Sequence, residues 1–206
     1  MSRRRDLAKR ALDLTVALAL AVVTLPVQAA AAAAIRGTLG SPVLFRQRRP
    51  GRDGVPFVLV KFRTMADVDP ARGLVDDAAR LTPLGRWLRS TSIDELPTLW
   101  NVVRGDLSLV GPRPLLMQYL ERYSPEQARR HEVRPGLTGL AQVAGRNALS
   151  WEDKLRLDVE YVDSRSLRGD LRILRATVPL LARRVGISAA GEATAAQFHG
   201  AAGPAS

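Results

Sequence analysis

Two adjacent carboxylates, Asp94 and Glu95, stand immediately before Leu96 and Pro97. Proline is tolerated in the first turn of a helix, so a helix is predicted to begin here, with Asp94 at or beside its N-cap. The helix dipole and the free backbone N–H groups favour an ionised carboxylate at that position, and such a group could act as a nucleophile or bind Mg²⁺. Acids are also common at helix starts simply as caps, so the pair alone does not establish a site.

Arg113 stands between two prolines, Pro112 and Pro114, in the stretch SLVGPRP (108–114). Proline restricts the backbone on both sides, so the guanidinium is presented with little freedom, which suits bidentate recognition of phosphate. A structural turn that carries a solvated arginine is the alternative interpretation.

Further basic residues recur close to glycine or proline. Loops of this composition let backbone and guanidinium groups approach an anion closely. Each segment alone is typical of a solvated loop, but together with the acidic pair they favour a site for a metal-bound diphosphate, as phosphoryl transfer requires. The segments are Lys61-Phe62-Arg63-Thr64, Arg134-Pro135-Gly136 and Gly145-Arg146-Asn147.

The composition narrows the available chemistry. The 206 residues include 31 Lys and Arg against 20 Asp and Glu, a formal net charge of +11, and no Cys. Disulfides, thiolate zinc sites and cysteine nucleophiles are therefore excluded, and two widely separated histidines, His131 and His199, cannot form an imidazole metal cluster. Neither GxSxG nor GxxxxGK[ST] occurs. The charge indicates an anionic partner, which could be nucleic acid, a phospholipid surface or a phosphorylated small molecule, and the length favours one domain.

Residues 14–35 carry no charge, and as one helix they would measure roughly 33 Å, about the thickness of a bilayer's hydrocarbon core. Pro26 would break such a helix, and basic residues, which mark the cytoplasmic side, flank both ends. We therefore expect a re-entrant hairpin that includes Arg10 and Asp13, bends at Leu25 and Pro26 and returns to the same leaflet. A spanning helix and a secretory signal are the alternatives. The flanking residues are Arg3, Arg4, Arg5, Lys9 and Arg10 before the segment and Arg36, Arg46, Arg48, Arg49 and Arg52 after it.

Local patterns predict the elements that would position the candidate residues. Two apolar runs, 42–45 and 57–60, are separated by glycines and a proline and predict a β-hairpin. A short helix is predicted over 83–89, and another from the Asp94 region to about Gly105.

Ser150 is predicted to cap a helix that extends to about Asp163. Asp158 falls on the apolar stripe of this helix, where a carboxylate must be paired, metal-bound or at a cleft edge. Residues 171–185 form a second amphipathic stripe, which could pack on the domain or lie on a membrane surface.

The local patterns divide the chain into three parts. An N-terminal re-entrant helix-break-helix hairpin with basic flanks occupies 1–36, a small, mostly helical domain with a short β-hairpin occupies 37–186, and an Ala/Gly-rich, loosely ordered tail occupies 187–206.

Five motifs follow one another along the chain. They are KFRTM (61–65), DELP (94–97) continuing into NVVRGD (101–106), SLVGPRP (108–114), PGLTG (135–139) and GRN (145–147). In this order they resemble the bacterial sugar transferase family, the small monotopic phosphoglycosyl transferases, and the stretch GRNALSW (145–151) is most similar to the PglC type. The resemblance implies a re-entrant membrane helix and a cytoplasmic α/β domain of an uncommon fold.

The resemblance also implies a reaction: transfer of a phosphosugar from a UDP-sugar to undecaprenyl phosphate, with release of UMP, at the cytoplasmic face of the bacterial membrane. Asp94 matches the family's nucleophile, which forms a covalent phosphosugar-enzyme, and Glu95 matches its dyad partner. Mg²⁺ is expected at Asp94, on the diphosphate, and the PglC-like stretch favours an N-acetylated amino sugar. The expected substrate-binding residues are Lys61, Arg63, Thr64, Arg89, Arg113, Pro114, Arg134, Arg146, Asn147 and Asp158.

Two alternatives stay open at this stage. One is a membrane-tethered basic binding module without catalysis, and the other is a one-step transfer in which Asp94 only binds Mg²⁺. Inner-leaflet phospholipid is an expected partner and nucleic acid is not, while the sequence predicts no oligomeric state.

Overall fold

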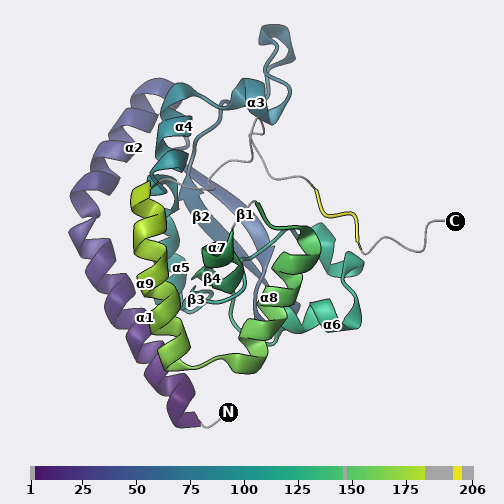
Figure 1. The fold of residues 1–206 in the computed structure, drawn as a ribbon. Helices are drawn as coiled ribbons and strands as arrows, with labels where there is room; N and C mark the ends of the chain where they lie inside the picture. Colours follow the sequence, from purple (N-terminus) through teal and green to yellow (C-terminus); the bar gives the residue numbers. More distant parts are fainter. Residues whose placement is uncertain (1–2, 146–147, 184–196, 201–206) are drawn as a thin grey trace, which may run out of the picture.

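The computed structural model describes residues 3–145, 148–183 and 197–200. Two small sheets lie in the interior, with α1, α2 and α9 along one side of the molecule and α6 and α8 on the other (Figure 1), so the predicted mixed α/β class is confirmed. The helices are α1 (Arg3–Val23), α2 (Leu25–Leu39), α3 (Asp77–Arg80), α4 (Pro83–Ser90), α5 (Leu99–Arg104), α6 (Pro125–Ala128), α7 (Leu140–Ala144), α8 (Trp151–Ser164) and α9 (Leu167–Arg183). The strands are β1 (Leu44–Pro50), β2 (Pro56–Phe62), β3 (Ser108–Val110) and β4 (Gly136–Thr138).

The predicted β-hairpin is confirmed by the antiparallel pairing of β1 with β2. Its register places Leu44 opposite Phe62 and Pro50 opposite Pro56. β1 begins two residues later than the predicted run 42–45 and ends five residues beyond it, because its basic residues also pair with β2, whereas β2 exceeds the run 57–60 by one residue at its start and two at its end.

Two buried side chains, one just before α5 and one within it, hydrogen-bond to the backbone of β2. Thr98 donates from its hydroxyl to the Val60 carbonyl at 2.8 Å, and Asn101 accepts from the Val60 N–H at 3.1 Å while donating to the Val58 carbonyl at 2.7 Å. These side chains satisfy backbone groups on the free edge of β2, which would otherwise lack partners.

A second, parallel pair of strands was not predicted from the sequence. β3 and β4 pair with Ser108 opposite Gly136 and Val110 opposite Thr138. The two backbones approach so closely that a Cβ at Gly136 would lie 2.1 Å from the backbone nitrogen of Gly111, so a larger residue is excluded at position 136. This pairing fixes the start of the loop that carries Arg113.

The helix break expected at Pro26 is present, and α1 and α2 meet at Thr24 with a bend of 59°. The two helices therefore form a shallow bend and not a tight hairpin. This bent pair, Arg3–Val23 with Leu25–Leu39, is called the bow below. Two side chains bond to carbonyls beside the break: the Thr24 hydroxyl donates to Leu20 at 2.6 Å, and the Gln28 amide donates to Ala21 at 3.4 Å.

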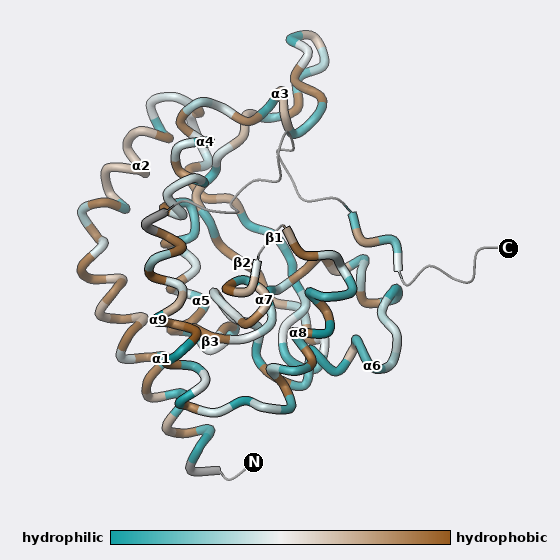
Figure 2. Tube along the Cα trace, viewed as in Figure 1, coloured by the Kyte–Doolittle hydropathy of each residue, from teal (hydrophilic) through white to brown (hydrophobic). Residues whose placement is uncertain are grey.

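The bow is mostly apolar around its bend (Figure 2), where its large side chains are exposed, and each arm buries side chains against the domain. Ala17 in α1 and Ile35 in α2 are fully buried in two core clusters. Among the described helices, none alone is long and apolar enough to cross a membrane, but the bent pair passes that test together. The exposed apolar residues around the bend are Leu18, Leu20, Val22, Val23, Leu25 and Val27.

The C-terminal helices cover the second sheet. Ser150 caps α8 as predicted, its hydroxyl accepting from the Asp153 N–H at 3.0 Å. The amphipathic helix predicted at 171–185 corresponds to α9, which packs on α7, β3 and β4. Within the predicted loose tail, Phe198 is only 3% exposed and sits against Tyr119 and the start of α8, so that description does not fit this residue.

Candidate active site

The acidic pair lies in a 3₁₀ helix, Ile93–Thr98, that leads directly into α5. The sequence predicted one helix with Asp94 at or beside its N-cap. Instead, Ser92 is the residue before the helix and has a positive φ of 57°, and Pro97 lies inside the 3₁₀ helix. The α-helix proper begins only at Leu99, because the proline ring and its missing N–H disfavour α-helical bonding through it.

Glu95 brings two cations from different elements together. One oxygen of its carboxylate accepts from the Lys61 ammonium of β2 and from the Arg113 guanidinium, both at 2.6 Å. Burial by itself would raise the pKa of Glu95, but the charges and hydrogen bonds of Arg113 and Lys61 outweigh it and hold the pKa well below its usual range. Glu95 is therefore a permanent anion that fixes the positions of both cations.

Asp94 has the opposite character, although it is the next residue. It is 8% exposed and, among the described residues, its carboxylate makes no ion pair or side-chain hydrogen bond. Burial and then the charge of Glu95 raise the pKa of Asp94 to about 6, against the attraction of Lys61, Arg89 and Arg113. At neutral pH Asp94 is thus mostly ionised, more basic than an ordinary aspartate, and close to several cations, which are the properties of a carboxylate nucleophile.

Arg89 and Thr64 lie on the Asp94 side of this cluster. The Arg89 guanidinium of α4 donates to the Thr64 hydroxyl at 3.0 Å. Burial lowers the pKa of Arg89, while the nearby charge of Asp94 raises it. The structure therefore brings these two predicted residues together with the acidic pair.

Arg63 was predicted to bind substrate, and its contacts in the described part of the chain are with the protein itself. Its buried guanidinium donates to the carbonyls of Met65 at 3.1 Å and Ser41 at 3.2 Å and pairs with Asp67 at 2.9 Å. Since these contacts occupy all three guanidinium nitrogens, Arg63 supports the loops around the site.

Asp158 was also predicted to bind substrate and is instead part of a buried ion pair. Its carboxylate accepts two hydrogen bonds from Arg130, at 3.0 and 2.6 Å, and both side chains are almost fully buried. Arg130 also donates to the carbonyl of Arg113 at 2.6 Å. Among the described residues, Arg130 and the backbone carbonyl of Arg113 thus link Asp158 to the site.

The other predicted binding residues are placed as follows. Pro114 follows Arg113 and lines a small cavity beside Glu95, and Arg134 is exposed at the start of β4. Arg146 and Asn147 lie outside the described residues, so their predicted role stays a prediction.

Arg10 and Asp13, which the sequence assigned to the membrane segment, are bonded to the domain. Arg10 donates to the carbonyls of Val102 and Val103 at 2.6 and 2.7 Å, at the C-terminal end of α5, where a cation is favoured by the helix dipole. Asp13 is buried and accepts from the Leu109 N–H at 3.1 Å. These two residues position α1 on the elements that carry the acidic pair and Arg113.

Arg49 of β1 is a site residue that the sequence interpretation missed. It lines the same cavity as Lys61, Glu95 and Arg113. In the sequence it was one of several arginines in a basic flank, and nothing in that run distinguished it from Arg48, because only the strand pairing decides which arginine faces inward.

The residues present are compatible with Mg²⁺. Among the described residues, no three His, Asp or Glu side chains are grouped as a metal cluster. Mg²⁺, however, is often held by one or two carboxylates together with substrate phosphates and water. Asp94, which has no ion-pair partner in the described part of the chain, is the carboxylate that could take that role, whereas Glu95 is engaged by its two cations.

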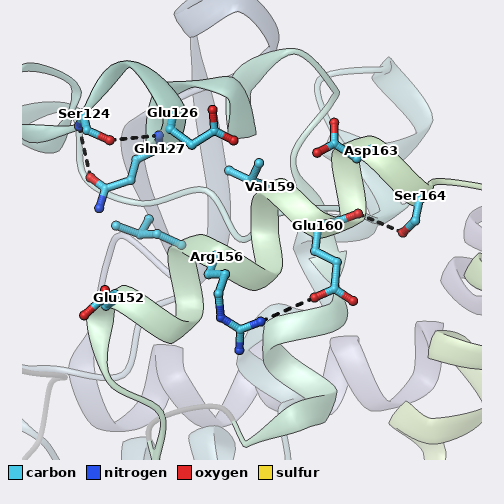
Figure 3. A pocket seen from close by; sticks show the side chains of 10 residues that line it. Ser124, Glu126, Gln127, Glu152, Arg156, Val159, Glu160, Asp163 and Ser164 are labelled. Carbon is cyan, nitrogen blue, oxygen red and sulfur yellow. Dashed lines mark hydrogen bonds and ion pairs between the residues drawn. The ribbon is translucent and has the colours of Figure 1, made fainter.

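A larger groove, of about 660 Å³, lies elsewhere, over α6 and α8 (Figure 3). Acidic side chains, Glu126, Glu152, Glu160 and Asp163, line it, and Arg156 reaches across to Glu160. It contains none of the predicted site residues and has the wrong charge for a phosphorylated ligand.

Comparisons with known proteins identify the family. The model of the family described as bacterial sugar transferase matches residues 4–184. An "uncharacterized sugar transferase EpsL" of Bacillus subtilis is 53% identical over 193 residues, which are 93% of this chain and 96% of that protein.

Two further relatives carry more specific names. A "UDP-glucose:undecaprenyl-phosphate glucose-1-phosphate transferase" of Caulobacter vibrioides is 46% identical, covering 85% of this chain and 70% of that protein. An "undecaprenyl-phosphate galactose phosphotransferase" of Salmonella typhimurium is 37% identical, covering 71% of this chain and 35% of that protein. With the family model matching nearly the whole described chain, this protein belongs to the bacterial sugar transferase family.

Proposed function

We propose that this protein transfers a sugar 1-phosphate from a UDP-sugar to undecaprenyl phosphate and releases UMP. The observation that carries the proposal is the pairing of unlike carboxylates: Asp94 is buried, basic and without an ion-pair partner among the described residues, and Glu95 is locked between Lys61 and Arg113. The names of the relatives, which act on undecaprenyl phosphate, support the acceptor.

In the proposed chemistry, an oxygen of Asp94 attacks the phosphorus that bears the sugar. A new O–P bond forms to Asp94, the P–O bond to UMP breaks, and its electron pair leaves with UMP. An oxygen of the lipid phosphate then attacks the same phosphorus, and Asp94 leaves as a free carboxylate. Lys61, Arg89 and Arg113 stabilise the charge that develops on the phosphoryl oxygens. Mg²⁺ held at Asp94 and the diphosphate would add further charge neutralisation.

The membrane arrangement is part of the proposal. The exposed apolar bend of α1 and α2 would enter the cytoplasmic leaflet, and the arms would stay packed on a domain at the cytoplasmic face. This arrangement would give a soluble nucleotide and a lipid phosphate access to one site.

The donor is tested with a panel of UDP-sugars. The PglC-like stretch favours an N-acetylated amino sugar, whereas two relatives are named for glucose and galactose. The panel should therefore contain UDP-glucose, UDP-galactose, UDP-GlcNAc, UDP-GalNAc and a UDP-bacillosamine derivative.

The deciding experiment follows UMP release and intact protein mass, with Mg²⁺, before and after undecaprenyl phosphate is added. We expect stoichiometric UMP and a mass increase of one phosphosugar before the lipid is present. UMP that forms only after lipid addition would favour one-step transfer, and no UMP with any donor would favour a binding module.

Asp94→Asn should abolish both UMP release and the mass increase of the protein, and should leave membrane association intact. Asp53→Asn, the same chemical change at an exposed turn position with a positive φ that asparagine tolerates, is the matched control.

A further inference from the structure

A small cavity of about 90 Å³ lies between the β1–β2 hairpin and the loop after β3. Its charged lining comprises Arg49, Lys61, Arg113 and Glu95. Three cations therefore face one carboxylate in the lining, and the neighbouring Asp94 compensates part of the remaining positive charge. At roughly 10–15 Å³ per enclosed water, the space holds several waters or one compact anion.

Arg49 is the least satisfied of these groups. One guanidinium nitrogen donates to Gln47 at 2.6 Å and another reaches the Pro114 carbonyl at 3.4 Å. Its Nε is buried and has no hydrogen-bond partner among the described residues. Burial, together with the nearby charge of Arg113, lowers the pKa of Arg49 to about 10. A buried cationic donor without a partner is costly, so an anion that reached it would be bound favourably.

The neighbouring cations keep donors free for such an anion. Glu95 takes one contact from Lys61 and one from Arg113, whereas an ammonium has three N–H donors and a guanidinium has five. A phosphate group in the cavity could therefore bind all three cations while Glu95 stays in place.

We propose that this cavity is a subsite for a phosphate group of a substrate and that the Arg49 guanidinium supplies one of its donors. The inference rests on the proposed function, which supplies two sources of that chemistry: the nucleotide phosphate that leaves as UMP and the phosphate of the lipid acceptor. Arg49 is thereby a binding residue that acts beside the acidic pair.

The test measures binding of three probes to the full-length, detergent-solubilised protein by calorimetry: UMP, a short-chain polyprenyl phosphate, and inorganic pyrophosphate. Arg49→Gln is compared with Arg48→Gln, which removes the same charge from the adjacent, exposed position of the same strand. Loss of a charge-assisted hydrogen bond predicts binding about 10- to 100-fold weaker for Arg49→Gln. Arg48→Gln should stay within about threefold of the wild type, because exposed charges contribute little.

The probes separate the two sources. Weaker binding of UMP alone would place the nucleotide phosphate in the subsite, and weaker binding of the polyprenyl phosphate alone would place the lipid phosphate there. Equal affinities of Arg49→Gln and Arg48→Gln for every probe would overturn the proposal. If the melting curve shows that Arg49→Gln is unfolded, Arg49→Lys, which keeps the charge but lacks the planar guanidinium donors, is measured against the same control.

UMP release by the wild type tests the proposed function, and binding by the Arg49 variants tests the subsite, so that either proposal can fail without the other. Turnover with no specific effect of Arg49 would support the function and contradict the subsite. Binding of pyrophosphate that depends on Arg49, without turnover of any donor, would support the subsite and contradict the function.

Discussion

The carboxylate of Asp13 accepts a hydrogen bond from the backbone N–H of Leu109, a residue 96 positions later in the chain. Asp13 belongs to the first helix of the bow, and Leu109 lies in β3, just before the loop of Arg113. Beside this bond, Lys9 pairs with Asp170 of α9 at 2.7 Å. The segment expected to enter the membrane is therefore bonded directly to the strand that positions a site cation.

Removing the Asp13 carboxylate should destabilise the protein measurably. Asp13→Ala leaves the buried Leu109 N–H without a partner, which costs about 1–3 kcal/mol and, for a chain of this size, roughly 2–12 °C in melting temperature. Asp13→Asn keeps an acceptor oxygen and should recover most of the loss. Differential scanning fluorimetry in detergent checks this, with Asp6→Ala on the exposed start of α1 as control. Equal melting temperatures for Asp13→Ala and Asp6→Ala would contradict it.

The raised pKa of Asp94 predicts the acid limb of the activity profile. The nucleophile must be ionised, and its pKa is about 6, so kcat/KM should be nearly constant above pH 7 and fall about tenfold per pH unit below 6. Initial rates of UMP release between pH 4.5 and 8 provide the measurement, after stability over that range has been confirmed. A profile that stays flat down to pH 4.5 would contradict the assignment.

The local elements could be predicted from the sequence because short-range chemistry determines them. Ser150 caps α8, Pro26 breaks the first long helix, and two apolar runs separated by turn residues form the β-hairpin. In contrast, β3 and β4 are three residues each, and their pairing depends on contacts distant in sequence, with Gly136 needed for the close approach. No local pattern reports such a pairing.

The sequence was enough to name most candidate site residues, but not to predict their pKa shifts and ion-pair partners. Asp94 was expected to be ionised, and at neutral pH it mostly is, but burial raises its pKa and outweighs the local effect of the short 3₁₀ helix. Asp158 was correctly expected to need a partner, although Arg130, far from it in sequence, could not be named. Arg49 differs from its neighbours only by the face of the strand on which it lies.

Glu95→Gln should move the acid limb of the profile to lower pH. Glu95 raises the pKa of Asp94, and it also neutralises Lys61 and Arg113, so its removal lowers that pKa on both counts. The same change loosens two cations, and misplacement by about 1 Å can cost roughly 100-fold in rate. We therefore expect a large fall in kcat/KM at pH 7.5 together with an acid limb displaced below pH 6.

The pH profile separates this role from simple loss of structure. Glu121→Gln, an exposed position, is the control and should keep the wild-type limb. If Glu95→Gln loses activity but its kcat/KM still falls below pH 6 as in the wild type, Glu95 does not act on Asp94 electrostatically.

Asp158→Asn should destabilise the protein strongly, because it leaves the Arg130 charge buried without its partner. Breaking a buried pair in this way costs about 3–5 kcal/mol, or roughly 6–20 °C in melting temperature here. The double variant Arg130→Met with Asp158→Leu removes both charges from a fully buried position and should return most of that stability, since apolar replacements of buried pairs are often neutral.

Activity should distinguish support of the loop from direct binding. Arg130 donates to the carbonyl of Arg113, so the double variant restores stability without restoring the bond that holds the site loop. We expect the double variant to have a melting temperature near that of the wild type. Its kcat/KM, measured by UMP release at 20 °C, should still be lowered. Asp163→Asn, an exposed acid of the same helix, is the matched control. Wild-type kcat/KM in a stable double variant would show that Arg130 and Asp158 serve the fold alone, and that the proline-flanked loop holds Arg113 in place by itself.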